Sequence, residues 1–154
     1  MGNRLETQLI PVLFEALQKD RFVTVATIDH ETGGPMIHAI SWIYAVDERT
    51  IRFAATSQSR MIENLEKNTA IAINMISNES TYTITGESHI LSKKVEGIPL
   101  KIAIVELAIK EIRDVMFYGS KMISEPVYEK TYDLAAAEKL DQQVIDALKK
   151  GAES

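Results

Sequence analysis

The stretch "FAATSQSRMIENLEKN", residues 53–68, passes from small apolar residues through a run of hydroxyl side chains to an arginine and then to a helical pattern. Its first residues predict the end of a strand. Residues 59–68 carry apolar side chains on one helical face and charged side chains on the other, and Ser59 suits the N-cap position of that helix. The stretch therefore predicts a strand followed at once by a helix, with hydroxyl groups at the junction.

This junction has the chemistry of a phosphate site. The backbone N–H groups and the positive dipole end of a helix N-terminus favour an anion, and an arginine fork matches phosphate oxygens. The polar side chains at the junction include Thr56, Ser57, Ser59 and Arg60. A simpler interpretation is that Ser59 only caps its helix and that Arg60 is a solvated surface charge. The local residues alone favour this simpler interpretation, because serine caps are common.

The residues on both sides of this stretch predict further strands. Residues 22–55 read as an antiparallel meander of three strands, the second of which is "MIHAISWIYAV". Two more strands, "TAIAINMI" and "TYTITGESHIL", follow the helix. The periodicity of residues 100–117, "LKIAIVELAIKEIRDVMF", fits a helix as well as a strand. Its β-branched residues favour a long strand, one that can bulge near Lys110 and Glu111.

Helices are predicted at both ends of the chain. Residues 5–22, "LETQLIPVLFEALQKDRF", have apolar side chains at helical spacing, with Pro11 either in the first turn or at a kink. The segment "DLAAAEKLDQQVIDALKK" predicts a helix that Asp133 caps, and whether it covers its own barrel or a partner's stays open. A loop is expected around Gly97 and Pro99, at an edge of the active site.

The composition suits one domain, residues 1–154, because the chain is 45% hydrophobic and has the length of a typical domain. A net charge of -5 with scattered basic residues argues against a nucleic-acid partner. The absence of a secretion signal and of any membrane-spanning apolar run predicts a cytoplasmic protein. The expected fold class is mainly β with flanking helices. Many short strands favour a closed barrel, because closure removes exposed edges.

The order of these pieces resembles the pyridoxamine 5'-phosphate oxidase-like, FMN-binding split-barrel family. The pieces that carry the resemblance read "RFVTVATID", "GGPMIHAISWIYAVDERTIRFAAT", "SRMIENLEKN" and "TAIAIN". It extends from residue 5 to about residue 118, and it comprises order, spacing and residue type together. The resemblance implies a split β-barrel of Greek-key type, FMN as the cofactor, and a homodimer with the flavin in a groove at the interface.

The resemblance also implies how the phosphate end of the cofactor is held. Ser59 and Arg60 would hold the FMN phosphate, whereas Met61 stands where many relatives have a second basic residue. That departure weakens the grip on the phosphate. The hydroxyl groups of Thr56 or Ser57 lie close enough in the sequence to compensate for it.

The flavin ring is expected between two neighbouring strands. The residues that the resemblance places at the ring are Ala39, Ile40, Ser41 and Trp42 on one strand and Ala54 and Ala55 on the other. Small side chains there allow the backbone to approach a flat ring closely. Thr81 and Thr83 fall where a partner subunit usually reaches across to the same flavin.

Several aromatic and titratable residues have simpler explanations. A tryptophan on a strand, such as Trp42, more often fills a core or an interface than stacks on a cofactor. The three histidines are isolated and lack ligand spacing, so no metal site is expected. His30 is expected to be exposed in a turn. His38 precedes the flavin segment, where it could bond to the cofactor or relay a proton, but a sheet-surface histidine is the simpler interpretation.

The implied function is that of an FMN-binding oxidoreductase that transfers a hydride or electrons, with a small-molecule substrate or a nicotinamide donor. The catalytic residues are unknown, because such transfer needs no side-chain acid or base. Pyridoxamine phosphate oxidation itself is not expected, since the C-terminal "AAEKLDQQVIDALKKGAES" lacks the substrate-holding residues of true oxidases. The alternatives are a non-catalytic carrier or sensor of flavin or haem, with His38 or His89 as the haem ligand, and a deazaflavin in place of FMN.

Overall fold

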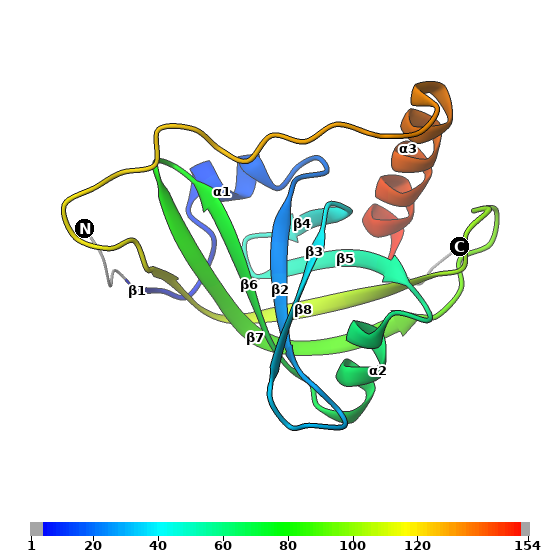
Figure 1. Ribbon diagram of the computed structural model, residues 1–154, viewed down its shortest axis with the longest axis horizontal. Helices are drawn as coiled ribbons and strands as arrows, with labels where there is room; N and C mark the ends of the chain where they lie inside the picture. Colours follow the sequence, from blue (N-terminus) through cyan, green and yellow to red (C-terminus); the bar gives the residue numbers. More distant parts are fainter. Residues whose placement is uncertain (1–4, 152–154) are drawn as a thin grey trace.

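The computed structural model describes residues 5–151, which form an antiparallel sheet with three helices around it (Figure 1). The elements in chain order are β1 (Leu5–Glu6), α1 (Pro11–Ala16), β2 (Val23–Ile28), β3 (Pro35–Ile40), β4 (Ile43–Asp47), β5 (Thr50–Thr56), α2 (Arg60–Lys67), β6 (Ala70–Ser77), β7 (Ser80–Ser92), β8 (Ile102–Asp114) and α3 (Leu134–Lys150). The predicted class, mainly β with flanking helices in a split barrel, is confirmed. None of the helices within the described range is long and apolar enough to cross a membrane.

The sheet curls so that its two ends are joined by the chain itself. Its strand order is β3-β2-β6-β7-β8-β5-β4, with β1 added beside β8. The two end strands, β3 and β4, are consecutive in the sequence and are separated only by Ser41 and Trp42. The split of the barrel lies between β3 and β4, the two end strands of the sheet. The dipeptide Ser41-Trp42 connects them across this split.

The single strand predicted for "MIHAISWIYAV" is wrong, because this segment changes its partner halfway. β3 pairs with β2, whereas β4 pairs with β5. The carbonyl of Ser41 accepts a hydrogen bond from the N–H of Arg21 at 2.9 Å, and the next carbonyl, that of Trp42, accepts from the N–H of Ala54 at 2.9 Å. Successive carbonyls thus accept hydrogen bonds from opposite sides of the split. The apolar alternation of the sequence continues through this break, so it does not reveal where one strand ends and the next begins.

The long strand predicted at residues 100–117 is confirmed as β8, and it is bulged at the predicted place. Thr85 on β7 lies opposite Glu111, but the next residue, Gly86, lies opposite Ile109, which leaves Lys110 as the extra residue. A Cβ atom at Gly86 would lie 2.1 Å from the carbonyl oxygen of residue 108. Only glycine allows the two strands to approach so closely at the bulge.

The N-terminal helix is shorter than predicted. The segment begins with β1, in which Leu5 lies opposite Arg113 of β8, and the helix α1 starts only at Pro11. The proline thus occupies the first turn, where its missing N–H costs little. The apolar side chains of Leu13 and Leu17 are buried in the barrel core, which explains the helical spacing of the segment.

The C-terminal helix α3 covers the sheet of its own chain, beside β4 and β5 (Figure 1). Asp133 caps it as predicted and accepts a hydrogen bond from the N–H of Ala136 at 3.0 Å. Val144 and Leu148 are fully buried against a second apolar cluster, which includes Ala54 and is separate from the barrel core. This helix and the residues before it therefore lie over the end of β5, near the split.

Candidate functional site

A cavity of about 810 Å³ opens at the split in the barrel. Its walls come from the β3–β4 junction, the end of β5, the start of α2, the loop before β8, the extended segment before α3, and α3 itself. The lining residues are Phe22, His38, Ala39, Ile40, Ser41, Trp42, Ala54, Ala55, Thr56, Ser59, Met61, Pro99, Leu100, Tyr128, Lys130, Tyr132, Ala136 and Leu140. The cavity is mostly apolar, with a few polar groups, as is typical of small-molecule sites.

The end of β5 forms one wall because this strand extends past its neighbour. The last residue of β5 that is paired with β4 is Phe53, opposite Ile43, so Ala54, Ala55 and Thr56 continue without a strand on that side. On the other side these three residues remain paired with β8. Ala54 itself is buried and its N–H donates to the carbonyl of Trp42, so the free edge of β5 begins at Ala55, where a small side chain leaves space for a ligand close to the backbone.

The cavity brings together most of the residues predicted from the resemblance. These are Ala39, Ile40, Ser41, Trp42, Ala54, Ala55, Thr56 and Ser59. The expected loop around Gly97 and Pro99 is also present, and Pro99 lines the cavity. The other four predicted residues do not line it, namely Ser57, Arg60, Thr81 and Thr83.

Ser57, Thr81 and Thr83 do not line the cavity, and the first two have other hydrogen-bond partners. The hydroxyl of Ser57 donates to the carbonyl of Lys93. Thr81 and Thr83 are on β7, where the hydroxyl of Thr81 accepts a hydrogen bond from the side-chain amide of Asn74 at 2.8 Å. Their predicted role concerned the flavin of a partner subunit, and that role stays a prediction.

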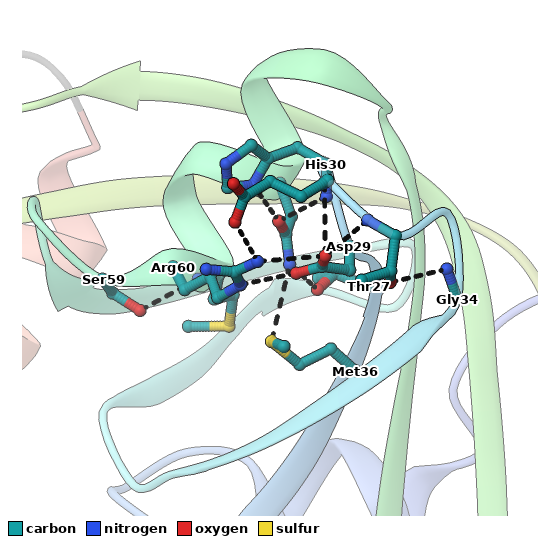
Figure 2. Close-up of polar contacts among 11 residues, drawn as sticks. Thr27, Asp29, His30, Gly34, Met36, Ser59 and Arg60 are labelled. Atoms are coloured by element: carbon teal, nitrogen blue, oxygen red, sulfur yellow. Dashed lines mark hydrogen bonds and ion pairs between the residues drawn. The ribbon is translucent and has the colours of Figure 1, made fainter.

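The guanidinium of Arg60 is bound by two carboxylates of the β2–β3 loop (Figure 2). Its Nε lies 2.5 Å from Oδ1 of Asp29, and its outer nitrogen lies 3.1 Å from Oδ2 of Asp29 and 2.5 Å from Oε1 of Glu31. Asp29 is 3% exposed and also accepts the N–H of Thr32 at 2.9 Å. The Arg60 guanidinium, helped by these N–H donors, holds the pKa of Asp29 well below its usual range.

Asn64 holds α2 against the same loop. Its fully buried side chain donates to the hydroxyl of Thr27 at 3.0 Å and accepts from the backbone N–H of His30 at 2.9 Å. The ring of His30, which was expected to be exposed, is half-buried, and its Nδ1 lies 2.7 Å from the same Asn64 oxygen. The predicted phosphate corner is thus part of a polar network that fixes the position of α2.

Ser59 caps α2 as predicted, since its hydroxyl accepts the N–H of Met61 at 3.1 Å. The side chain of Met61 is buried and borders the cavity. At the α2 side, the described residues that line the cavity are therefore Thr56, Ser59 and Met61, and none of these carries a charge.

A second set of lining residues was not predicted, and it comes from the extended segment between β8 and α3. Tyr128, Lys130 and Tyr132 alternate there, so that their side chains fall on one side of an extended backbone. Among the described residues that line the cavity, Lys130 is the only lysine, and there is no arginine, aspartate or glutamate. The alternation of aromatic and basic residues was the available signal, but a segment without secondary structure offers no periodicity on which to place it.

Hydrogen bonds near the cavity attach this segment and α3 to the rest of the chain. Asp141 of α3 accepts the indole N–H of Trp42 at 2.8 Å, and the same oxygen lies 3.2 Å from the ammonium of Lys130. The hydroxyl of Tyr128 donates to Asp20 at 2.9 Å. Burial, together with the bond to Asp20, raises the pKa of Tyr128 to about 12, so this phenol stays protonated at neutral pH.

His38 also lines the cavity, and its Nδ1 atom is buried without a hydrogen-bond partner among the described residues. A buried polar atom without a partner is uncommon, because it costs the desolvation free energy of the group.

Comparison with known proteins agrees with this architecture. The sequence model described as pyridoxamine 5'-phosphate oxidase matches residues 9–115 of the chain. No curated protein sequence matches the chain at a significant level. The matched residues include the β3–β4 junction, the end of β5 and the whole of α2, but they stop before Tyr128.

Several solved structures share the fold. A putative pyridoxamine 5'-phosphate oxidase from Lactobacillus delbrueckii is 13% identical, with a TM-score of 0.60 over 73% of this chain and 98% of that chain. HupZ from Group A Streptococcus is 18% identical, with a TM-score of 0.58 over 73% and 98% of the two chains. An F420 reductase is 17% identical, with a TM-score of 0.55 over 67% and 98%. The structures show the shared fold and the sequence match covers most of the barrel, so the chain belongs to the pyridoxamine 5'-phosphate oxidase family.

Proposed function

We propose that this protein is an FMN-binding oxidoreductase that transfers a hydride or electrons between the flavin and a small substrate. The observation that carries the proposal is the cavity at the split. Its volume of about 810 Å³ is within the roughly 300–1,000 Å³ that is typical of small-molecule sites. It meets the end of β5 at Ala55 and Thr56, which have no strand partner on the β4 side, so that a flat ring can approach the backbone there.

The residues present fit a flavin ring. The ring would lie between the β3–β4 junction and the end of β5, where His38 also lines the cavity. The hydroxyl groups of Thr56 and Ser59 lie at the α2 side, where the ribityl phosphate chain is expected. Arg60 contributes indirectly, because it holds α2 to the β2–β3 loop through Asp29.

The bound flavin would supply the redox chemistry, and the protein would bind it, orient it and exclude water. Trp42 has a defined role in orientation. Its indole is held by Asp141, so the backbone at the junction is fixed to α3 on one side and to β5 on the other. Leu100 and Leu140 form apolar walls that limit the access of solvent to the ring.

The proposal includes a homodimer with the flavin at the interface. The structure exposes several large apolar side chains on β3, on the loop before β8 and on the segment after β8, and a second copy would cover them. They include Ile37, Leu100, Phe117, Tyr118, Ile123 and Val127. Ile37 is 67% exposed and precedes the lining residues of β3, so an interface there would continue into the cavity. Thr81 and Thr83 of the second copy would then reach the same flavin.

Absorption spectroscopy tests this function. The protein, loaded with FMN and freed of excess ligand, is expected to keep the bands of oxidised flavin at one flavin per chain. Anaerobic addition of NADH or NADPH is then expected to bleach those bands. A protein that retains flavin without any reduction would be a carrier, and a Soret band with added haem would replace the flavin proposal. A colourless protein that rejects FMN would contradict the proposal.

A further inference from the structure

Arg60 and Lys130 are two cationic side chains near the cavity, and they differ in what they face. The guanidinium of Arg60 is paired with Asp29 and Glu31, so two carboxylates surround the cation nearest to the start of α2. An incoming anion would meet these carboxylates as well as the arginine. Lys130, in contrast, lines the cavity, and none of the described lining residues carries a carboxylate.

The ammonium of Lys130 is held in place at the cavity wall. Its side chain is 23% exposed, and its nitrogen lies 3.2 Å from Oδ1 of Asp141. That oxygen also accepts the indole N–H of Trp42, so the carboxylate is shared between two donors. An ammonium has three N–H donors, and the pairing with Asp141 uses one of them. The remaining donors are available to an anion, and a group positioned in advance loses less entropy on binding.

One aromatic ring lies beside this ammonium, and a second lines the same cavity. The ring centroid of Tyr128 lies 5.7 Å from the Lys130 nitrogen, and Tyr132 lines the cavity two residues further along. The hydroxyl of Tyr128 is bonded to Asp20, which fixes the ring at the β2 side of the segment. This side of the cavity thus combines a flat apolar surface with a single positive charge.

We propose that Lys130 is the anion-binding group of this cavity, which takes a flat ring compound whose carboxylate or phosphate binds the ammonium. The inference rests on the proposed function for the occupant of the rest of the cavity. If the flavin phosphate lies at the α2 side, the anion at Lys130 belongs to an acidic aromatic substrate. If the flavin lies in the opposite orientation, the anion is the flavin phosphate itself. The chemistry at Lys130 is the same in both cases, and only the source of the anion differs.

The test compares two pairs of ligands that differ in charge. Binding of FMN and riboflavin, and of benzoate and benzamide, is measured by calorimetry on the full chain and on Lys130→Gln. We expect the variant to lose about tenfold or more in affinity for the anion of at least one pair, with the neutral member changed by less than about twofold. The pair that responds identifies the source of the anion. Lys139→Gln, an exposed lysine of the same helix as Asp141, is the matched control and is expected to change neither pair.

A second variant protects the test against a folding defect. Asp141→Asn removes the competing negative charge but keeps an oxygen that can accept from Lys130 and Trp42, so affinity for the responding anion is expected to rise. Equal losses for the charged and neutral members, or no response of either pair, would overturn the proposal. If the wild-type protein binds neither flavin, the proposed function fails, but benzoate and benzamide still decide the role of Lys130. A wild-type protein that binds none of the four ligands would overturn both.

Discussion

The helix that begins at Arg60 and the extended segment that precedes α3 both border the cavity, but they contribute to it in opposite ways. The helix has strong sequence signals, yet its most characteristic side chain is bound to Asp29 and Glu31 outside the cavity. The extended segment has no periodic pattern, yet it supplies Tyr128, Lys130 and Tyr132 to the wall. A local sequence pattern thus locates a helix or strand. Where its charged side chains point depends on partners that are distant in the sequence.

The largest expected effect is at the end of β5. Ala55→Leu places a branched side chain beside the bare strand edge, where the ring is expected to lie. Flavin affinity should fall about a hundredfold or more, because a well-filled site does not accept extra methylene groups. The measurement is the FMN dissociation constant. Ala70→Leu, at an exposed position of β6, is the matched control, and normal FMN binding by Ala55→Leu would show that the ring does not lie there.

The extended segment is tested next by Tyr132→Ala. This ring is 49% exposed, so its removal should leave the fold intact. The measurement is the FMN dissociation constant. It should rise by about threefold to tenfold, since aromatic pairs contribute about 0.5–1.5 kcal/mol beyond buried area. Tyr118→Ala, in the same segment but away from this cavity, should have no effect. Equal effects of the two substitutions would show that Tyr132 makes no specific contact with the ligand.

Ser59→Ala separates capping from ligand binding at the helix. Loss of the bond to the N–H of Met61 should lower the free energy of unfolding by about 1 kcal/mol, which urea denaturation measures. FMN affinity should fall as well, because the hydroxyl lines the cavity. Ser57→Ala, whose hydroxyl faces the carbonyl of Lys93, is the comparison and should affect FMN less. The opposite ranking would place the phosphate at Ser57.

Arg60→Ala should have a small effect on the cofactor. Because its guanidinium is bound to two carboxylates, the ratio of FMN to riboflavin affinity should change by less than about twofold, whereas the midpoint of urea unfolding should fall. Titration of both flavins measures the ratio. A tenfold loss for FMN alone would restore the phosphate-binding role that the family resemblance implies for this arginine.

The smallest effect is a change in the acid dependence of stability. The pKa of Asp29 is lowered in the folded state, mainly by Arg60. Its contribution is therefore complete above the unfolded value of about 3.9 and is lost as the pH falls through the lower folded-state value. Below about pH 4, the free energy of unfolding should decline more steeply in the wild-type protein than in Arg60→Ala. Parallel curves would mean that the pair does not stabilise the fold.

Much of the fold could be predicted because its signals are local. The caps at Ser59 and Asp133 and the β-branched run of β8 each lie within one element. The break at Ser41 and Trp42 could not be predicted from pattern, since apolar alternation continues through it and the change of partner is decided by Arg21 and Ala54.

The candidate site also contains residues that could be predicted from the sequence and residues that could not. The alanines of β5 and the residues of the β3–β4 junction were found through order and spacing, which the family shares. The direction of Arg60 depends on Asp29, which is 31 positions away, and the place of Lys130 depends on Asp141 in the next helix. Those contacts arise only from the tertiary arrangement, and Lys130 lies beyond the residues that match the family.

The most direct test of the central claim uses the single tryptophan of the chain, Trp42, which lines the cavity. FMN is titrated into the flavin-free protein while tryptophan fluorescence is recorded. If the flavin lies at the split, the fluorescence should be quenched, the quench should saturate at one flavin per chain, and it should be lost in Ala55→Leu. Unchanged fluorescence on FMN binding, or an equal quench in Ala55→Leu, would contradict the placement of the flavin at the split of the barrel.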